Sequence, residues 1–124
     1  MHNRMGNIDF GKRGEEAALQ YLQANGFYIR HTNWRWGHKE LDIVAEKNKT
    51  LHVVEVKTRK ANSLLEPQAG VDRQKRQHLI RAANAYVVYH HLTFDVQFDI
   101  ISVVAQGEEY KVEYIPAAFY PTAG

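Results

Sequence analysis

The stretch that decides the fold is residues 40–57, which read ELDIVAEKNKTLHVVEVK. It contains two runs rich in β-branched residues, LDIVA and LHVVEV, separated by the polar, turn-forming residues 47–50. This pattern is typical of a β-hairpin. A loop at residues 47–50 pairs Glu46 with Leu51 and so sets the register of the two strands.

This register brings four charged side chains to one face of the hairpin. Asp42 is expected directly across from Glu55, and Glu40 directly across from Lys57, because side chains alternate along a strand. Opposed residues have Cβ atoms roughly 5 Å apart, and opposed like charges destabilise a sheet. A divalent cation would offset the repulsion between Asp42 and Glu55, and Mg²⁺ is often held by only one or two carboxylates.

A purely structural interpretation of the same residues is also open. In it Glu40 and Lys57 form an ordinary cross-strand ion pair and Asp42 caps a turn, since charge clusters are often structural. The register decides between the two, because a slip of one residue would put Asp42 and Glu55 on opposite faces of the sheet.

Length and composition indicate one globular domain, with a core at about residues 11–104 and tails at 1–8 and 116–124. The 124 residues include no cysteine, which excludes disulfides and thiolate metal sites and suits a reducing cytoplasm. The first 14 residues lack the apolar segment of a signal peptide, and no apolar run approaches the ~18 residues that span a bilayer. We therefore expect a cytoplasmic protein with no membrane partner.

The charge is unevenly distributed along the chain. Residues 1–91 carry 15 Lys/Arg and 9 Asp/Glu, a net +6, whereas residues 92–124 carry 1 and 5, a net −4. The carboxylate hairpin lies in the basic part. Basic residues around an acidic pocket suit a site that cleaves phosphodiesters, although a solvated basic face explains the charge equally well.

A first helix is expected at residues 11–25, capped by Asn7 or Asp9 and stopped by Gly26. Spacing residues by 100° places Glu15 on its inward, apolar face. Glu15 is therefore a candidate third acid of the site. The alternative is that its charge favours the helix N-terminus.

Basic residues follow the hairpin and open a second expected helix at residues 71–89, after a loop at 61–69. The first half of this helix is polar and basic, so it should protrude and offer its cations to a polyanion, unless it is only a solvated face. The candidate nucleic-acid contacts are Arg59, Lys60, Arg73, Lys75 and Arg76, with Arg81 further along the helix.

The remaining strands complete a sheet. A strand at residues 27–34 precedes the hairpin. The stretch Trp34-Arg35-Trp36, which leads into the hairpin, either packs in the core, which we favour, or stacks on bases. A strand at 98–104 follows the second helix and should run parallel to the second hairpin strand. Its Asp99 is interpreted as structural. A last edge strand at 110–115 is expected to end at Pro116.

An ordered set of motifs resembles a known family. Asp42, then 12 residues, then Glu55-Val56-Lys57, resembles the metal-binding pattern of the PD-(D/E)xK nuclease superfamily. The wider set is similar to the YraN-like family, bacterial proteins related to archaeal Holliday junction resolvases, and covers roughly residues 11–104. It comprises Gly14-Glu15, the strings at residues 40–45 and 54–59, Lys75 and Phe98-Asp99.

The resemblance implies an α/β, restriction-endonuclease-like fold, with a central mixed β-sheet flanked by α-helices in the order α-β-β-β-α-β-β. It implies that Asp42, Glu55 and the Val56 carbonyl hold Mg²⁺ or Mn²⁺. Lys57 would orient or polarise the attacking water. Glu15 would match the helix-borne acid of the resolvase relatives.

The chain departs from the family pattern at two positions. Lys39 stands where a glycine is usual, and Gln97 where an arginine is common, which affects the positioning of a substrate more than the chemistry. The expected activity is that of a metal-dependent endonuclease acting on DNA, branched DNA included. The alternatives are a non-catalytic nucleic-acid-binding module on the same fold and a scaffold protein. A junction-cleaving enzyme would be expected to work as a homodimer.

Overall fold

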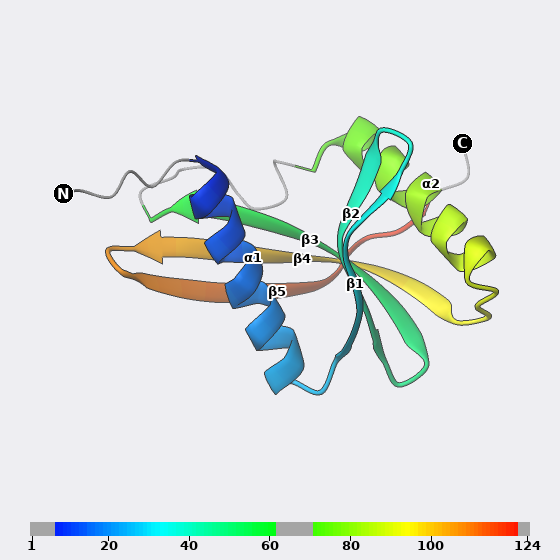
Figure 1. The fold of residues 1–124 in the computed structure, drawn as a ribbon, viewed down its shortest axis with the longest axis horizontal. Helices are drawn as coiled ribbons and strands as arrows, with labels where there is room; N and C mark the ends of the chain where they lie inside the picture. Colours follow the sequence, from blue (N-terminus) through cyan, green and yellow to red (C-terminus); the bar gives the residue numbers. More distant parts are fainter. Residues whose placement is uncertain (1–6, 62–70, 122–124) are drawn as a thin grey trace.

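The computed structural model describes residues 7–61 and 71–121 as a five-stranded sheet with two helices (Figure 1). The elements are α1 (Asn7–Ala24), β1 (Tyr28–Trp36), β2 (Lys39–Lys47), β3 (Thr50–Lys60), α2 (Arg73–Tyr89), β4 (Asp95–Gln106) and β5 (Glu109–Phe119). The mixed α/β architecture and the expected order of elements are confirmed. Neither helix in this part of the chain has the length and apolar character of a membrane-crossing segment. The expected loop at 61–69 lies almost wholly outside the described residues.

The strands are arranged in the sheet in their order along the chain, β1-β2-β3-β4-β5. The expected hairpin register is confirmed: β2 and β3 are antiparallel, with Glu46 opposite Leu51 and Ile43 opposite Val54. The turn is shorter than the predicted four residues, because Asn48 and Lys49 alone make it, both with positive φ. Asparagine tolerates that conformation, and two-residue turns of this kind match the twist of a hairpin.

The helix α2 carries the chain from β3 to β4, which run parallel as expected. β5 then pairs antiparallel with β4 and forms one edge of the sheet. The prediction that Pro116 ends this strand is wrong, because β5 continues to Phe119. Proline is tolerated at a sheet edge or a bulge. The register with β4 shifts here, and Ala117 takes a φ of 48°.

Two smaller expectations at the N-terminal end are also corrected. The described part of the first helix is Asn7–Ala24, so Asp9 lies within the helix and not at the predicted cap position. The first strand runs two residues beyond its predicted end, to Trp36. The favoured core role holds for Trp34, which packs against buried residues. Trp36 does not share it, since 43% of its surface is exposed.

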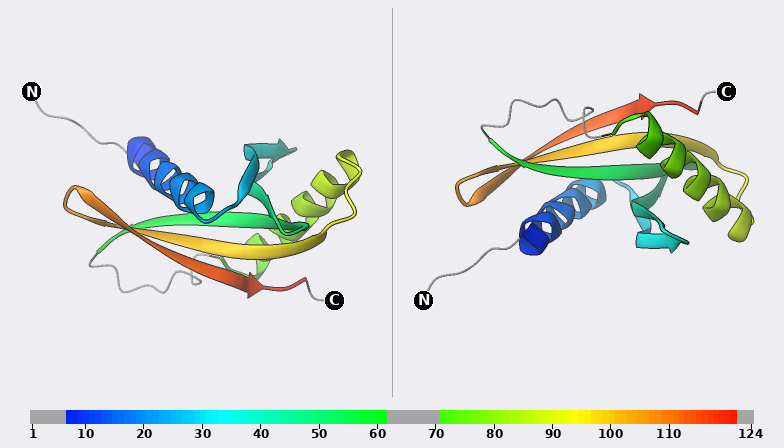
Figure 2. Two further views of the ribbon diagram at one scale, coloured as in Figure 1. Left: turned by 90° about the horizontal axis from the view of Figure 1, so that it is seen from below. Right: turned by 90° about the horizontal axis from the view of Figure 1, so that it is seen from above.

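Neighbouring residues along β3 pack against different helices, so the two helices cover opposite faces of the twisted sheet, whose ribbon is drawn in Figure 2. Val53 on β3 packs with the α2 side chains, whereas the next residue, Val54, packs with Ala18 and Leu22 of α1. α1 contacts β1, β3, β4 and β5, and α2 contacts β1 and β2. The central strand β3 is therefore buried on both sides, and it carries Glu55 into the interior.

Candidate active site

Asp42 and Glu55 lie where the pairing of β2 with β3 stops. The last residues paired between these strands are Ile43 and Val54, so the two acids are the next residues beyond the ladder. Asp42 Oδ2 accepts a hydrogen bond from the backbone N–H of Val56 at 2.9 Å. The Asp42 side chain thus takes the position of a backbone partner, and its carboxylate interacts electrostatically with that of Glu55.

The surroundings of Asp42 disfavour its charged form. Burial and the neighbouring Glu55 carboxylate raise the pKa of Asp42 to about 8. The Val56 N–H and the ammonium of Lys75 act in the opposite direction, but they do not cancel these effects. Two carboxylates in contact at this depth therefore hold a proton at neutral pH unless another positive charge joins them.

Glu55 is only 4% exposed, and its two oxygens differ. Oε2 lies 3.4 Å from Lys57 Nζ and 3.5 Å from Lys75 Nζ. Oε1 is buried, and among the described residues it has no hydrogen-bond partner. Buried polar atoms are nearly always partnered, so an unpartnered carboxylate oxygen beside a second carboxylate is the position at which a ligand would be expected.

Gly14 lets α1 approach β3 directly after the site. A Cβ atom at Gly14 would collide with the side chain of Thr58, the residue that follows Lys57. Glycine in a helix normally weakens it, so this close packing is the physical reason for the residue. The contact anchors the first half of α1 at the site end of β3.

Glu15 is held at β1 and does not join the acid pair. Its Oε1 accepts a hydrogen bond of 2.8 Å from Asn33 Nδ2. The β1–β2 register places Asn33 opposite Asp42, so Glu15 is near the pair. Within residues 7–61 and 71–121, however, no three His, Asp or Glu side chains gather into a group that could hold a metal ion.

The ion pair between Glu40 and Lys57, which the structural interpretation predicts, is wrong. Glu40 Oε2 instead lies 3.3 Å from Arg35 Nε, because Arg35 is directly opposite on β1. Lys57 is thereby left for Glu55. The structural alternative, in which Glu40 would satisfy Lys57 and Asp42 would cap a turn, is not the arrangement observed.

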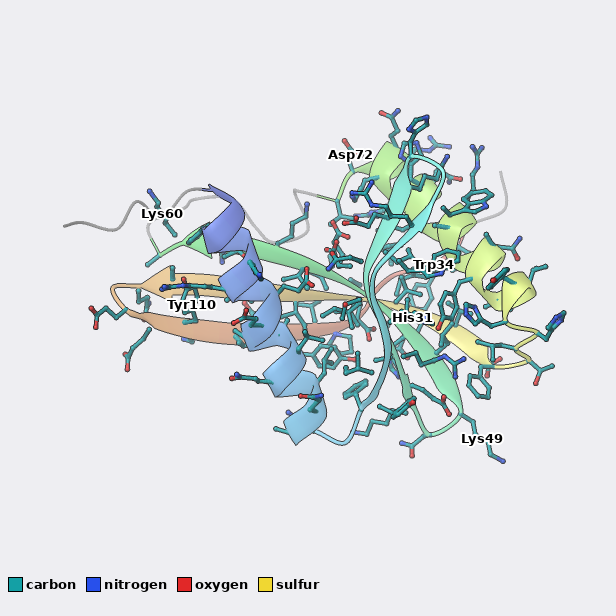
Figure 3. All side chains as sticks on the ribbon, in the orientation of Figure 1. His31, Trp34, Lys49, Lys60, Asp72 and Tyr110 are labelled. Atoms are coloured by element: carbon teal, nitrogen blue, oxygen red, sulfur yellow. The ribbon has the colours of Figure 1, made fainter. Side chains whose placement is uncertain are left out.

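Four of the five predicted nucleic-acid contacts lie on β3 and the first turns of α2, the two elements that carry Glu55 and Lys75. Arg73 is exposed in the first turn of α2, and Lys60 is exposed at the end of β3, as Figure 3 shows for Lys60. Arg59 is half-buried on β3. Arg76 donates from Nε to the Val71 carbonyl at 2.8 Å and lies over the Phe119 ring.

Lys75, the fifth predicted nucleic-acid contact, also makes a contact that was not predicted, with Glu55. It reaches Glu55 because it shares one helical face with Leu79, Ala82 and Tyr86, which pack on the sheet. That spacing of four, seven and eleven residues was visible in the sequence. Ser102 was also missed: it lies opposite Lys57 on β4, is fully buried, and its Oγ has no hydrogen-bond partner within the described chain.

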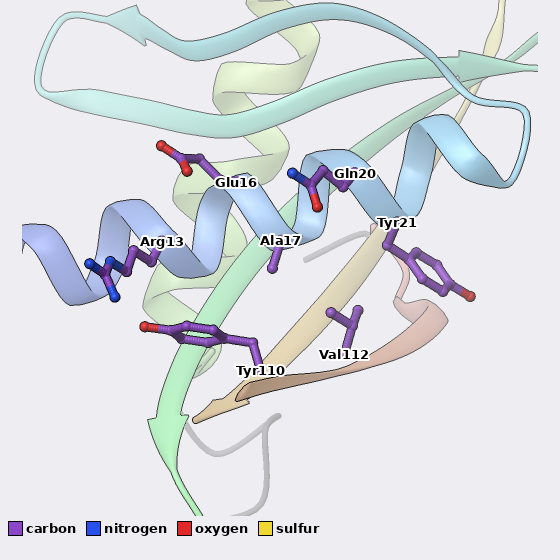
Figure 4. Close-up of a pocket in the computed structure, with 7 residues that line it drawn as sticks. All are labelled: Arg13, Glu16, Ala17, Gln20, Tyr21, Tyr110 and Val112. Atoms are coloured by element: carbon purple, nitrogen blue, oxygen red, sulfur yellow. The ribbon is translucent and has the colours of Figure 1, made fainter. Parts of the chain in front are cut away.

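The hollow between α1 and β5 is separate from this site. It has a volume of about 540 Å³, and Arg13, Glu16, Gln20 and Tyr110 are among the side chains around it (Figure 4). One acid and one cation face it, and none of the predicted site residues lines it. The chemistry therefore concentrates at the acid pair on the sheet.

Comparison with known proteins places the chain among bacterial relatives. The profile of a family described as "Uncharacterised protein family UPF0102" matches residues 14–103. A UPF0102 protein of Bacteroides thetaiotaomicron is 45% identical over 113 residues, which cover 91% of this chain and 93% of the relative. UPF0102 proteins of Flavobacterium psychrophilum and Porphyromonas gingivalis are 41% and 43% identical over 90% of this chain, covering 94% and 84% of the relatives.

Proposed function

Since the chain belongs to the UPF0102 family, whose description names no activity, we propose a function from its own site: a metal-dependent endonuclease that hydrolyses phosphodiester bonds in DNA, on a restriction-endonuclease-like fold. The observation that carries the proposal is the contact between Asp42 and Glu55 beneath two lysines. A buried acid whose pKa is strongly raised by burial and a neighbouring carboxylate, as for Asp42, is typical of functional sites.

The donors at the pair fit a hard divalent cation such as Mg²⁺ or Mn²⁺. Glu55 Oε1 has no hydrogen-bond partner among the described residues, and Asp42 Oδ2 alone is engaged by the Val56 N–H. The Val56 carbonyl is the third proposed ligand, because the N–H and C=O of one strand residue face the same neighbour. When bound, such an ion stabilises charge that develops on a phosphate and lowers the pKa of a coordinated water.

Lysine and arginine side chains of the chain would supply the remaining positive charge for binding and cleaving the phosphodiester. Lys57 and Lys75 place two ammonium groups on one side of Glu55, where they can face the scissile phosphate and stabilise its developing charge. Lys57 is also the group proposed to orient the attacking water. The proposed DNA-backbone contacts are Arg59, Lys60, Arg73 and Arg76.

A cleavage assay tests the proposal. Wild-type protein is incubated with linear, single-stranded, flapped and four-way DNA, in Mg²⁺, Mn²⁺ or chelator. Cleavage should require metal, and Asp42→Asn or Glu55→Gln should lower its rate at least about 100-fold, as expected for removing a charge-stabilising group. Glu46→Gln, which changes an acid of β2 paired with Arg30, should cleave like wild type. Unchanged cleavage by both site variants would refute the assignment.

A second function, DNA binding without turnover, is favoured by one observation. Both lysines already lie near Glu55 Oε2, so part of the acid charge is offset without an ion. This function predicts salt-dependent DNA affinity that does not respond to metal. Calorimetric titration with Mn²⁺ separates the two, because heat of binding that disappears in Glu55→Gln supports the enzyme.

A further inference from the structure

The outward face of α2 carries a stripe of residues that the acid pair does not use. Arg73, Arg76, Ile80, Arg81 and Asn84 recur at helical spacing along one side of the helix. Two hollows of about 460 and 480 Å³ lie against this stripe and share Ile80. Each has the size of a small-ligand pocket. We call the two together the α2 groove, in which Arg73 and Tyr120 line the first hollow and Trp36 lines the second.

The charge of the α2 groove has one sign. Three arginines line it, and none of the described residues around either hollow is Asp or Glu. The helix itself contains no acid from Arg73 to Tyr89. Asp72, which caps the helix, is engaged by the Lys75 N–H. A groove lined in this way attracts a polyanion.

An exposed aromatic ring lines each of the two hollows of the groove. Tyr120 is 69% exposed and Trp36 is 43% exposed. The Arg76 guanidinium lies 5.4 Å from the centre of the Phe119 ring, and Lys39 Nζ lies 5.4 Å from that of Trp36. Rings interleaved with cations are the surface on which single-stranded nucleic acids stack their bases while their phosphates bind the cations.

We propose that the α2 groove binds a single-stranded segment of nucleic acid. Its phosphates contact Arg73, Arg76 and Arg81, and its bases stack on Tyr120 and Trp36. A base within a duplex has its faces covered by its neighbours and cannot use these rings, and the carboxylates of an acidic peptide supply charge but no ring that would stack on them. The occupant that fits both the charge and the rings is therefore an unpaired strand.

The groove leads to the acid pair along a single helix. Lys75, two residues after Arg73, reaches Glu55 from the opposite side of α2. On the proposed function, with which this inference is linked, the substrate is DNA with a single-stranded arm held in the groove and its scissile phosphate near Glu55. The groove itself needs no metal.

Binding is tested by fluorescence anisotropy in chelator, where cleavage cannot occur. The probes are a labelled thymidine oligonucleotide of about 12 nucleotides, within the usual site sizes, and a duplex of equal length. The single strand should bind more tightly. Tyr120→Ala should weaken this binding at least about five-fold, the lower limit for losing one stacked base, whereas Tyr120→Phe keeps the ring and should bind like wild type. Arg81→Glu should also weaken it and flatten the salt dependence.

Tyr28→Ala is the matched control, since Tyr28 is 67% exposed on β1 outside the groove. Equal affinity for duplex and single strand, or no loss in Tyr120→Ala, would overturn the inference. So would displacement of the probe by polyglutamate of equal charge. The binding and cleavage assays are independent, so a wild-type protein that binds the single strand in this way but never cleaves supports the groove and refutes only the proposed enzyme.

Discussion

Two sets of buried acids on the same sheet have opposite surroundings. Asp99 on β4 is fully buried, yet each of its oxygens accepts two hydrogen bonds. The donors are His52 and Tyr114 to Oδ2, and Gln97 and the Ala117 N–H to Oδ1. Glu55 is also buried, but one oxygen has two ammonium neighbours and the other has no hydrogen-bond partner within the described residues.

Burial raises the pKa of both acids, and the number of hydrogen-bond donors decides whether that rise persists. Burial alone would raise the pKa of Asp99, but hydrogen bonds from His52, Ala117 and its other donors lower it below the usual value. Burial and the Glu55 charge raise that of Asp42. Asp99 is thus an acid stabilised in its charged form by the fold, whereas the acid pair is left short of positive charge, which a ligand could supply.

The largest effect is expected from removing the satisfied acid. Asp99→Ala leaves four donors without their acceptor and should destabilise the protein by about 3–5 kcal/mol, as for breaking a buried charged pair. Urea unfolding measures this change. Asp95→Ala, an exposed acid on the same strand, should stay within about 0.5 kcal/mol of wild type. A small loss of stability in Asp99→Ala would show that the hydrogen bonds to Asp99 do not distinguish it energetically from the acid pair.

The next effect is stabilisation by metal at the acid pair alone. Mn²⁺ at about 100 times its dissociation constant should add about 2.7 kcal/mol to the stability, seen as a higher Tm. Glu55→Gln should abolish the shift, whereas Asp99→Asn, if folded, should retain it because the Asp99 oxygens are already engaged. A shift that survives Glu55→Gln would place the ion elsewhere.

The contact that anchors α1 beside the pair should be worth less. Gly14→Ala should destabilise the protein by about 1–2 kcal/mol, because overpacking against Thr58 outweighs the better helix propensity of alanine. The loss should shrink in a Thr58→Ala background, which removes the atom nearest to the new Cβ. Thermal unfolding of the four proteins measures the coupling. Additive effects would mean that α1 does not depend on this contact.

The smallest effect is a gain in stability. Asp42→Asn removes the repulsion with Glu55 and should stabilise the metal-free protein by about 1 kcal/mol near pH 8. The folded-state pKa of Asp42 is raised to about 8, so the wild type loses stability as the pH rises from about 4 to 8, and the advantage of the variant grows over that range. Asp99 behaves oppositely, since its contribution is lost only as the pH falls below about 4. Unfolding curves at pH 4, 6 and 8 measure the stability difference between Asp42→Asn and the wild type, and a difference that shrinks with rising pH would contradict the prediction.

Local patterns were sufficient for much of the fold. The alternation in residues 40–57 and their polar turn correctly gave the register of β2 and β3, and the helix between β3 and β4 correctly implied a parallel pair. The turn length was missed because it depended on two residues adopting positive φ. The prediction that Pro116 ends the last strand failed because β5 lies at the edge of the sheet, where a missing N–H matters little. That edge position is a property of the whole sheet and is not recorded in the local sequence.

The candidate site was predictable only in part, because its partners come from strands and helices considered separately. The contact between Asp42 and Glu55 followed from the hairpin alone. The ion pair between Glu40 and Arg35 could be predicted only from the register of β1 with β2, which the hairpin sequence does not contain. The reach of Lys75 to Glu55 required α2 to be placed on the sheet. Each missed contact spans two elements, and no local pattern records the distance between them.

The Asp99 carboxylate joins three strands, and this links distant parts of the molecule. It connects His52 of β3 and Tyr114 of β5, and through the Ala117 N–H it holds the bulge after which β5 continues to Phe119. Phe119 and Tyr120 form one wall of the α2 groove. A substitution at Asp99 would therefore change the shape of a surface that Asp99 does not contact. In a screen for variants with weak nucleic-acid binding, substitutions in the interior of the sheet are expected beside those in the groove itself.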